Sequence, residues 1–183
     1  MSGDLKMINS ITSIRNLFFI SLLILTSACR NGKDRGTEIY KPGENDMTEL
    51  NRFMVQKDRE RIQNYIERKK LNMSESPTGL WYLILKEGEG AKFTDRDKVV
   101  MEYECYLLDG TKCYSSASLG PRELVLGRSD MEAGLNEGLR MLQPGAEAIF
   151  ILPPYLAFGL IGDGKKIPSR AVIVYHVNIL PAE

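Results

Sequence analysis

The sequence contains few of the side chains that carry most enzyme chemistry. Its 183 residues include one histidine, three cysteines and one tryptophan. A single histidine and widely spaced cysteines do not form a set of metal ligands, so we expect no metal and no cofactor. The 24 basic and 24 acidic residues give a formal net charge of zero, and no strong positive field would attract nucleic acid. We therefore expect no nucleic-acid partner.

The apolar run at residues 17–25 is too short to span a membrane, which requires about 20 apolar residues. Lys6 and Arg15 precede this run, and the small residues Thr26, Ser27 and Ala28 follow it. This order predicts a secretory signal over residues 1–28. The next residue, Cys29, resembles the acylated cysteine of a bacterial lipobox. We predict a lipid-anchored envelope protein facing the periplasm, with a flexible tether over residues 29–46; plain secretion and a retained anchor are the alternatives.

The other two cysteines, Cys105 and Cys113, flank the turn Asp109-Gly110. If that turn is a two-residue hairpin loop, Cys105 lies opposite Tyr114 and Cys113 points to the other face. A disulfide between them would then have poor geometry, whereas a bulged turn would change the parity. We expect two buried or half-buried free thiols.

A long charged helix is predicted over residues 47–71, within a segment 47–72, with Asp46 as its N-cap. Residues 48–72 carry seven basic and four acidic side chains, a net charge of +3. Two interpretations are open: a working surface that binds anionic lipid or a second copy of the chain, or a solvated face of a helix docked on the domain. The apolar side chains fall into two groups at helical spacing, which are Leu50, Phe53 and Met54, and then Ile62, Tyr65 and Ile66.

From residue 73 to residue 183 the pattern is mostly that of β-strands, with one helix predicted over residues 132–142. Leu135, Leu139 and Leu142 form the apolar stripe of this helix, which ends before Pro144-Gly145. One short helix on a curved antiparallel sheet is an α+β fold. The predicted strands cover residues 80–85, 99–107, 124–126, 148–152 and 172–179.

A series of small anchors follows the strand at 99–107 in a characteristic order. They are Asp109-Gly110, Tyr114-Ser115-Ser116, Glu123 to Gly127, Gly134 to Gly138, Pro144-Gly145, Ala157-Phe158-Gly159 and Ile167-Pro168. This order resembles the FKBP-type peptidyl-prolyl cis-trans isomerases over roughly residues 80–180. The resemblance implies a curved sheet wrapped on one short helix, and clients that are proline-containing polypeptides.

The resemblance also implies a site. Tyr103, Phe158, Ile167 and Tyr175 would grip the proline ring, and the backbone N–H of Glu132 would donate to the substrate carbonyl. The remaining walls would be Cys113, Tyr114, Leu124, Met131 and Leu135. Rotation about an amide bond needs no proton transfer, so a site of this kind contains few reactive groups.

Several positions depart from the family pattern. Highly active members usually have Phe-Asp at Cys113-Tyr114, Trp at Leu135 and Tyr at Phe158, and Arg122 stands at a further aromatic wall position. These departures predict weakened catalysis and an altered ligand preference. The alternative functions are a weak or inactive peptide-binding or chaperone module, and a structural lipoprotein that works through its long helix.

A finer resemblance rests on Tyr114-Ser115, Leu119-Gly120-Pro121, Gly134 to Met141 and Gly162-Asp163. These segments are similar to the gliding-motility-associated isomerase lipoproteins of Bacteroidetes-type bacteria.

The other candidate groups are expected to have structural roles. His176 is expected to be structural or exposed, Ser115 and Ser116 to form hydrogen bonds at the hairpin end, and Glu132 to be an acid at a helix start.

Overall fold

The computed structural model describes residues 44–128 and 130–181. They belong to one compact unit, residues 43–183. The predicted signal, Cys29 and the tether up to residue 43 lie outside the described residues. Within the described part of the chain, the longest helix is too polar and charged to cross a bilayer, and no other helix has the required length.

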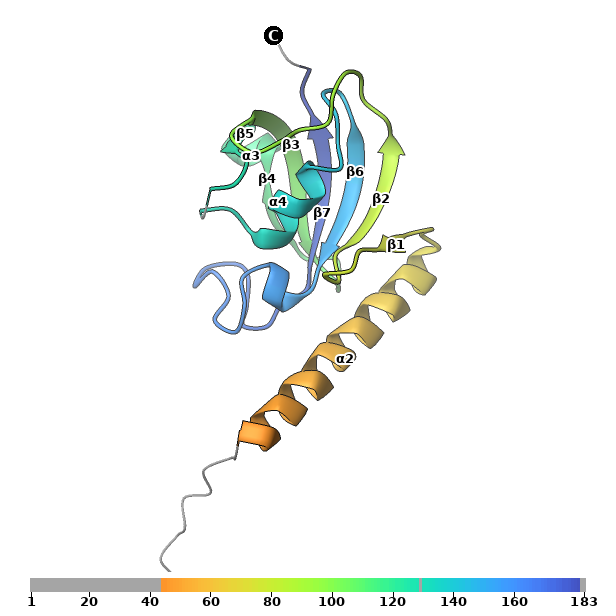
Figure 1. Cartoon of the computed structure of the whole chain (residues 1–183), viewed down its shortest axis with the longest axis vertical. Helices are drawn as coiled ribbons and strands as arrows, with labels where there is room; N and C mark the ends of the chain where they lie inside the picture. The colour runs from red at the N-terminus through yellow and green to blue at the C-terminus, as the bar shows by residue number, and fades with distance from the viewer. Residues whose placement is uncertain (1–43, 129, 182–183) are drawn as a thin grey trace, which may run out of the picture. The chain divides into compact units, whose positions relative to one another are not determined.

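The centre of the fold is a seven-stranded antiparallel sheet (Figure 1). Its order is β1-β2-β6-β7-β3-β4, and β5 pairs with the first half of β3. The predicted α+β architecture is therefore confirmed. The strands are β1 (Ser74–Glu75), β2 (Trp81–Lys86), β3 (Lys98–Leu107), β4 (Lys112–Ser115), β5 (Arg122–Val125), β6 (Glu147–Leu152) and β7 (Ile173–Ile179).

The helix predicted over residues 132–142 is α4 (Ala133–Leu139), shorter at its C-terminal end. The N–H groups of Met141 and Leu142 donate to carbonyls three residues back, so the last residues form tight turns. Two short helical segments were not predicted, α3 (Ser116–Leu119) and the 3-10 helix η1 (Pro154–Leu156). Both are too short for an apolar periodicity to be recognised.

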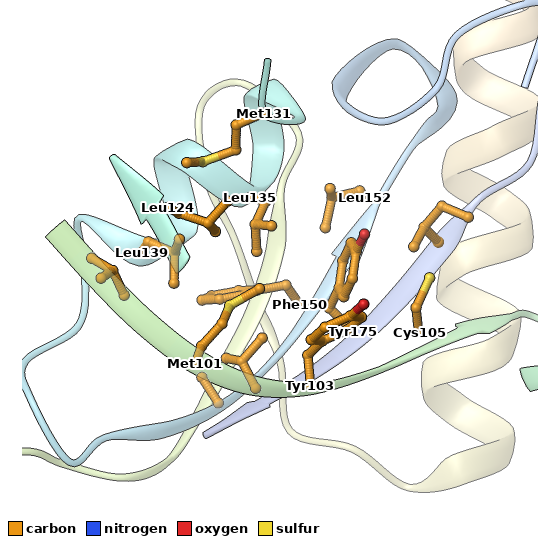
Figure 2. Packing of buried hydrophobic residues seen from close by; sticks show 14 of the residues in the cluster. Met101, Tyr103, Cys105, Leu124, Met131, Leu135, Leu139, Phe150, Leu152 and Tyr175 are labelled. Carbon is orange, nitrogen blue, oxygen red and sulfur yellow. The ribbon is translucent and has the colours of Figure 1, made fainter. Parts of the chain in front are cut away.

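Helix α4 packs on one face of the sheet through the predicted leucine stripe, as Figure 2 shows for Leu135 and Leu139 above Phe150. Leu135 and Leu139 are fully buried, and Leu142 is 1% exposed. Gly138 lets the helix approach closely, because a Cβ there would lie 2.8 Å from the ring of Phe150. This face of the sheet holds the larger core cluster and the predicted site.

The opposite face of β6 and β7 packs against α2 (Glu44–Lys69). Strand alternation places Ile149, Ile151 and Val174 there, next to Ile62 and Tyr65 of the helix. The second half of α2 is thus a docked helix with a solvated outer face, in agreement with one of the two interpretations. The helix begins at Glu44 rather than Met47, so Asp46 lies in its first turn and is not the N-cap.

The C-terminal end of α2 also differs from the prediction and falls at Lys69. Lys70 adopts a left-handed conformation with φ of 55°. Its N–H donates to the carbonyl of Glu67, and the N–H of Leu71 donates to that of Ile66. These two bonds form a Schellman motif, which ends the helix two residues before the predicted limit.

An ion pair joins the middle of α2 to the loop before β7. Arg170 Nη2 lies 2.7 Å from Asp58 Oδ2, and Asp58 is only 4% exposed. The backbone N–H of Arg170 donates to the carbonyl of Gly159. The helix is therefore connected to both ends of the 159–170 loop, which carries part of the predicted site.

Candidate functional site

The fold brings the predicted site residues together. Seven of them are buried in the core cluster beneath α4, and Tyr114 and Phe158 are partly buried and pack against it. They come from β3, β4, β5, α4, β7 and two loops, so sheet topology, and not local sequence, assembles the site. The buried seven are Tyr103, Cys113, Leu124, Met131, Leu135, Ile167 and Tyr175.

Two tyrosines form the aromatic centre of this cluster. The ring centroids of Tyr103 and Tyr175 are 6.2 Å apart, with an interplanar angle of 58° (Figure 2). Burial raises the pKa of both hydroxyl groups above the ordinary value for tyrosine. Both side chains therefore stay neutral and keep their O–H donors throughout the physiological range.

Glu132 is the tenth predicted residue, and its side chain has a role that the sequence did not indicate. The Tyr175 hydroxyl donates to Glu132 Oε1 at 2.7 Å, and Arg122 Nη1 donates to the same oxygen at 3.3 Å. Glu132 stands at the start of α4, as predicted, but its side chain makes no capping bond to the helix. Its carboxylate instead bridges β5 and β7.

The backbone of Glu132 fits the donor role implied by the family resemblance. Its carbonyl accepts the N–H of Asn136, which starts the helical hydrogen bonding of α4. Within the described residues, the N–H of Glu132 itself donates to no protein acceptor. Among residues 44–128 and 130–181, nothing therefore prevents this N–H from binding a carbonyl group of a ligand.

The loop that carries Ile167 is held by Asp163. Its Oδ1 accepts the backbone N–H groups of Lys165 at 2.9 Å and Ile167 at 2.8 Å. The Tyr114 hydroxyl donates to the other carboxylate oxygen. Gly162 is required in this loop, because its φ is 79° and a Cβ would lie 2.2 Å from the Ile167 carbonyl oxygen.

Cys105 and Cys113 are both free and buried, as predicted. Cys105 pairs with Tyr114, but a bulge next to this pair makes Cys113 the extra residue of β4. Because of the bulge, both thiols lie in the same cluster, and the parity of a two-residue loop does not hold. Burial, together with the neighbouring Cys113, raises the pKa of Cys105 to about 12, so this thiol stays protonated.

The other candidate groups lie outside the cluster or have structural partners. His176 is exposed and meets the ring of Tyr106 edge-on at 5.6 Å. Ser116 Oγ accepts the Tyr103 N–H at 3.1 Å, so its predicted role as a hydrogen bonder at the hairpin end is confirmed. Among the described residues, His, Cys, Asp and Glu side chains do not gather in threes as a metal site would require.

The sequence model of the FKBP-type peptidyl-prolyl cis-trans isomerases matches residues 89–180, about half of the chain, and this range includes every wall of the cluster. The chain belongs to this family.

Individual relatives agree with this assignment. The probable FKBP-type isomerase FkpA of Neisseria meningitidis is 41% identical over 104 residues, which is 56% of this chain and 38% of the relative. The FkpA isomerase of Aeromonas hydrophila is 37% identical over 116 residues, covering 63% and 42%. The chain spans less than half the length of these curated relatives.

The FKBP fold is also found in a crystal structure of the isomerase from Pseudomonas syringae pv. tomato. It superposes with a TM-score of 0.59 at 21% identity, covering 70% of this chain and 92% of that one. At this identity the likeness concerns the fold alone. The finer resemblance to gliding-motility-associated lipoproteins stays a prediction.

Sequence reasoning named Arg122 as a departure but missed its pairing with Glu132. A signal was present, because a cation among apolar wall positions needs a nearby anion. Glu132, at the start of the next helix, is an acid at another wall position.

Proposed function

We propose that this protein accelerates cis-trans isomerisation of X-Pro peptide bonds. The observation that supports this function best is the assembly of the ten predicted site positions in and around one core cluster, in a chain that matches the family over residues 89–180. The proline ring is held by Tyr103, Phe158, Ile167 and Tyr175, and the Glu132 N–H orients a substrate carbonyl.

Amide physics explains how such a cluster acts as a catalyst. The planar amide resists rotation with a barrier of about 18–20 kcal/mol, because its C–N bond has partial double-bond character. The planar form is charge-separated, and the twisted transition state is less so. Apolar surroundings therefore disfavour the planar form relative to the twisted one, and a fixed N–H donor adds binding that depends on geometry.

The assay should use full-length protein in mild detergent and a proline peptide with an apolar residue before the proline. Phe158→Ala and Tyr175→Ala each remove most of an aromatic wall. We expect each to lower kcat/KM about tenfold to a hundredfold, the equivalent of about 1.5–3 kcal/mol of buried aromatic contact.

Tyr106→Ala is the matched control, because Tyr106 is also on β3 but packs on the opposite face of the sheet. It should keep the wild-type rate once its melting curve shows a folded protein. A folded wild-type protein that gives only the uncatalysed rate would contradict the proposed activity.

A peptide-binding module with weak turnover is the second candidate function. Leu135 stands where highly active members have Trp, and the Arg122–Glu132 pair introduces charge among the walls. Both changes reduce aromatic contact with a proline ring. Saturable binding of a labelled proline peptide without rate acceleration, abolished by Phe158→Ala, would identify this function.

We also propose that the protein works in the bacterial cell envelope, anchored through acylated Cys29 and assisting the folding of envelope proteins. The sequence order of basic residues, apolar run and Thr26-Ser27-Ala28-Cys29 supports this.

We propose in addition that two copies associate through the first half of α2. Its side chains Met47, Leu50 and Phe53 are 52%, 50% and 60% exposed.

A further inference from the structure

A buried charged group replaces part of the aromatic wall. The Glu132 side chain is 7% exposed, and the Arg122 side chain is 27% exposed. Arg122 Nη1 lies between the two carboxylate oxygens, 3.3 Å from Oε1 and 3.1 Å from Oε2. Only the contact to Oε1 has the angles of a hydrogen bond, so the fully buried Oε2 is held by charge attraction alone.

This arrangement fixes Arg122 at the edge of the site. Tyr175, 2% exposed, donates to Oε1 and prevents the carboxylate from turning away. Within residues 44–128 and 130–181, the guanidinium donates through Nη1 alone, so its Nε and Nη2 groups have no protein acceptor. A guanidinium carries five N–H donors, and most of these remain available to a ligand.

The position of the Arg122 guanidinium determines which part of a bound peptide its free N–H groups can contact. Arg122 is bonded to the side chain of Glu132, whose backbone N–H is the proposed donor to the substrate carbonyl. With a substrate carbonyl on that N–H, the Arg122 guanidinium, bonded to the same residue, would be close enough to reach the polypeptide that flanks the proline. An aromatic wall at the same place would favour apolar neighbours instead.

We infer that Arg122 and Glu132 determine specificity, and that the site prefers prolines with an acidic residue directly adjacent in the client chain. This inference rests on the proposed proline site. Arg122 supplies the attraction through its free donors. Glu132 limits it, because its buried carboxylate neutralises part of the guanidinium charge.

The test uses two peptide series, with Glu, Gln or Lys either before or after the proline. Both kcat/KM and the Kd of dye-labelled peptides are measured with the full-length protein. In the series whose varied residue lies next to Arg122, we expect the wild-type kcat/KM and affinity to be about two- to fivefold higher for the Glu peptide than for the Lys peptide. This is the range for a partly solvated ion pair. The preference should shrink in 1 M salt.

Removing the charge of Arg122 and removing the charge of Glu132 should change the preference for Glu over Lys peptides in opposite directions. Glu132→Gln keeps the acceptor for Tyr175 and removes the negative charge, so the preference for Glu should increase. Arg122→Leu leaves the carboxylate without its partner, so the preference should reverse towards Lys. If that variant does not fold, the double variant Arg122→Leu/Glu132→Gln removes both charges and should show no preference.

Lys98→Gln is the charge control. Lys98 is an exposed cation at the start of β3, paired with Glu123, and this variant should keep the wild-type preference. Equal rates and equal Kd values for Glu, Gln and Lys peptides in wild type would overturn the inference while leaving the isomerase activity intact. Absence of turnover for every peptide would instead contradict the proposed activity, and the Kd values alone would then decide the preference.

Discussion

The Tyr114 side chain stands where highly active family members have an acid, and the structure gives it a different partner. Its hydroxyl donates to Asp163, whose carboxylate also accepts two backbone N–H groups of the loop that ends at Ile167. Lys166 Nζ lies 5.3 Å from the centroid of the Tyr114 ring on the same loop. The residue that departs from the family pattern thus anchors one of the proposed proline-gripping residues.

This anchor should depend on pH in a defined direction. Burial by itself would raise the pKa of Asp163, but the hydrogen bonds from Tyr114 and the loop amides lower it below the ordinary 3.8. A lowered carboxyl pKa stabilises the fold above the unfolded-state value, and that contribution is lost as pH falls through the folded-state value. The hydrogen bond to Asp163 raises the pKa of Tyr114 above 10, so the hydroxyl keeps its proton throughout the neutral range.

Amide hydrogen exchange measures the anchor directly. We expect the protection of the Lys165 and Ile167 amides to be constant from pH 7 to about pH 4 and to fall below that. Tyr114→Phe should lower it about two- to tenfold at pH 7, as expected for one net hydrogen bond. The Phe93 amide, bonded to the Leu142 carbonyl away from this loop, is the internal control. Equal protection in wild type and Tyr114→Phe would show that the tyrosine does not hold the loop.

Hydrophobic periodicity in the sequence predicts the burial of some side chains, but not the contacts of those whose partners lie far along the chain. The burial of Leu135 and Leu139 follows from helical spacing, because one face of a short helix must meet the sheet. The direction of the Glu132 carboxylate does not follow, because it depends on Tyr175, 43 residues later in the chain. The facing of Cys113 was left open, because a bulge changes which face a strand residue occupies without leaving a sign in the alternation of residues.

At the scale of elements, α2 is a helix with two different halves. Its second half is buried through Ile62 and Tyr65, and Asp58 is tied to Arg170. Its first half projects three large apolar side chains at positions i, i+3 and i+6, which share one face. The sequence separated a first apolar group, Leu50, Phe53 and Met54, from a second, Ile62, Tyr65 and Ile66. It could not show which group the sheet covers, since both have helical spacing.

The proposed dimer assigns the exposed half to a second copy of the chain. Phe53→Glu places a charge at the most exposed side chain of that stripe and should convert a dimer to a monomer in analytical ultracentrifugation of the full-length protein in detergent. Asn51→Glu adds the same charge at another exposed position of the helix and should leave the dimer intact. A wild-type protein that sediments as a monomer at every concentration would exclude this interface.

The long strands of the sheet could be predicted from the sequence, and the shortest ones could not. The long strands were recognised within one or two residues, because β6 is apolar on both faces after Glu147, and β3 and β7 keep one continuous apolar face. The two-residue β1 was not predicted, since so few residues give no reliable periodicity. The four-residue β4 was expected only as the second arm of a hairpin after Asp109-Gly110, in which Cys105 does pair with Tyr114. β4 matters for the site, because it carries Cys113 and Tyr114.

At the scale of the whole molecule, the proposed anchor would determine where the proposed proline site meets polypeptides. A single acyl chain gives marginal, reversible membrane binding, whereas two or more hold a protein firmly, at about 0.8 kcal/mol per buried methylene. The basic segment 48–72, with a net charge of +3, offers a weaker and purely electrostatic route to the same surface. The two routes differ in their response to salt.

Fractionation of cells that express the full chain separates these routes. We expect wild type to stay in the membrane fraction after a 1 M salt wash and to incorporate labelled fatty acid, because acyl burial is not screened by salt. Cys29→Ser should lose both properties. Cys105→Ala is the matched control, since that thiol is buried in the core and its removal should leave the protein acylated and membrane-bound. Release of wild type by salt would favour attraction of the basic helix to anionic lipid over acylation, and a membrane-bound Cys29→Ser variant that resists salt would indicate that the apolar segment at residues 17–25 is retained.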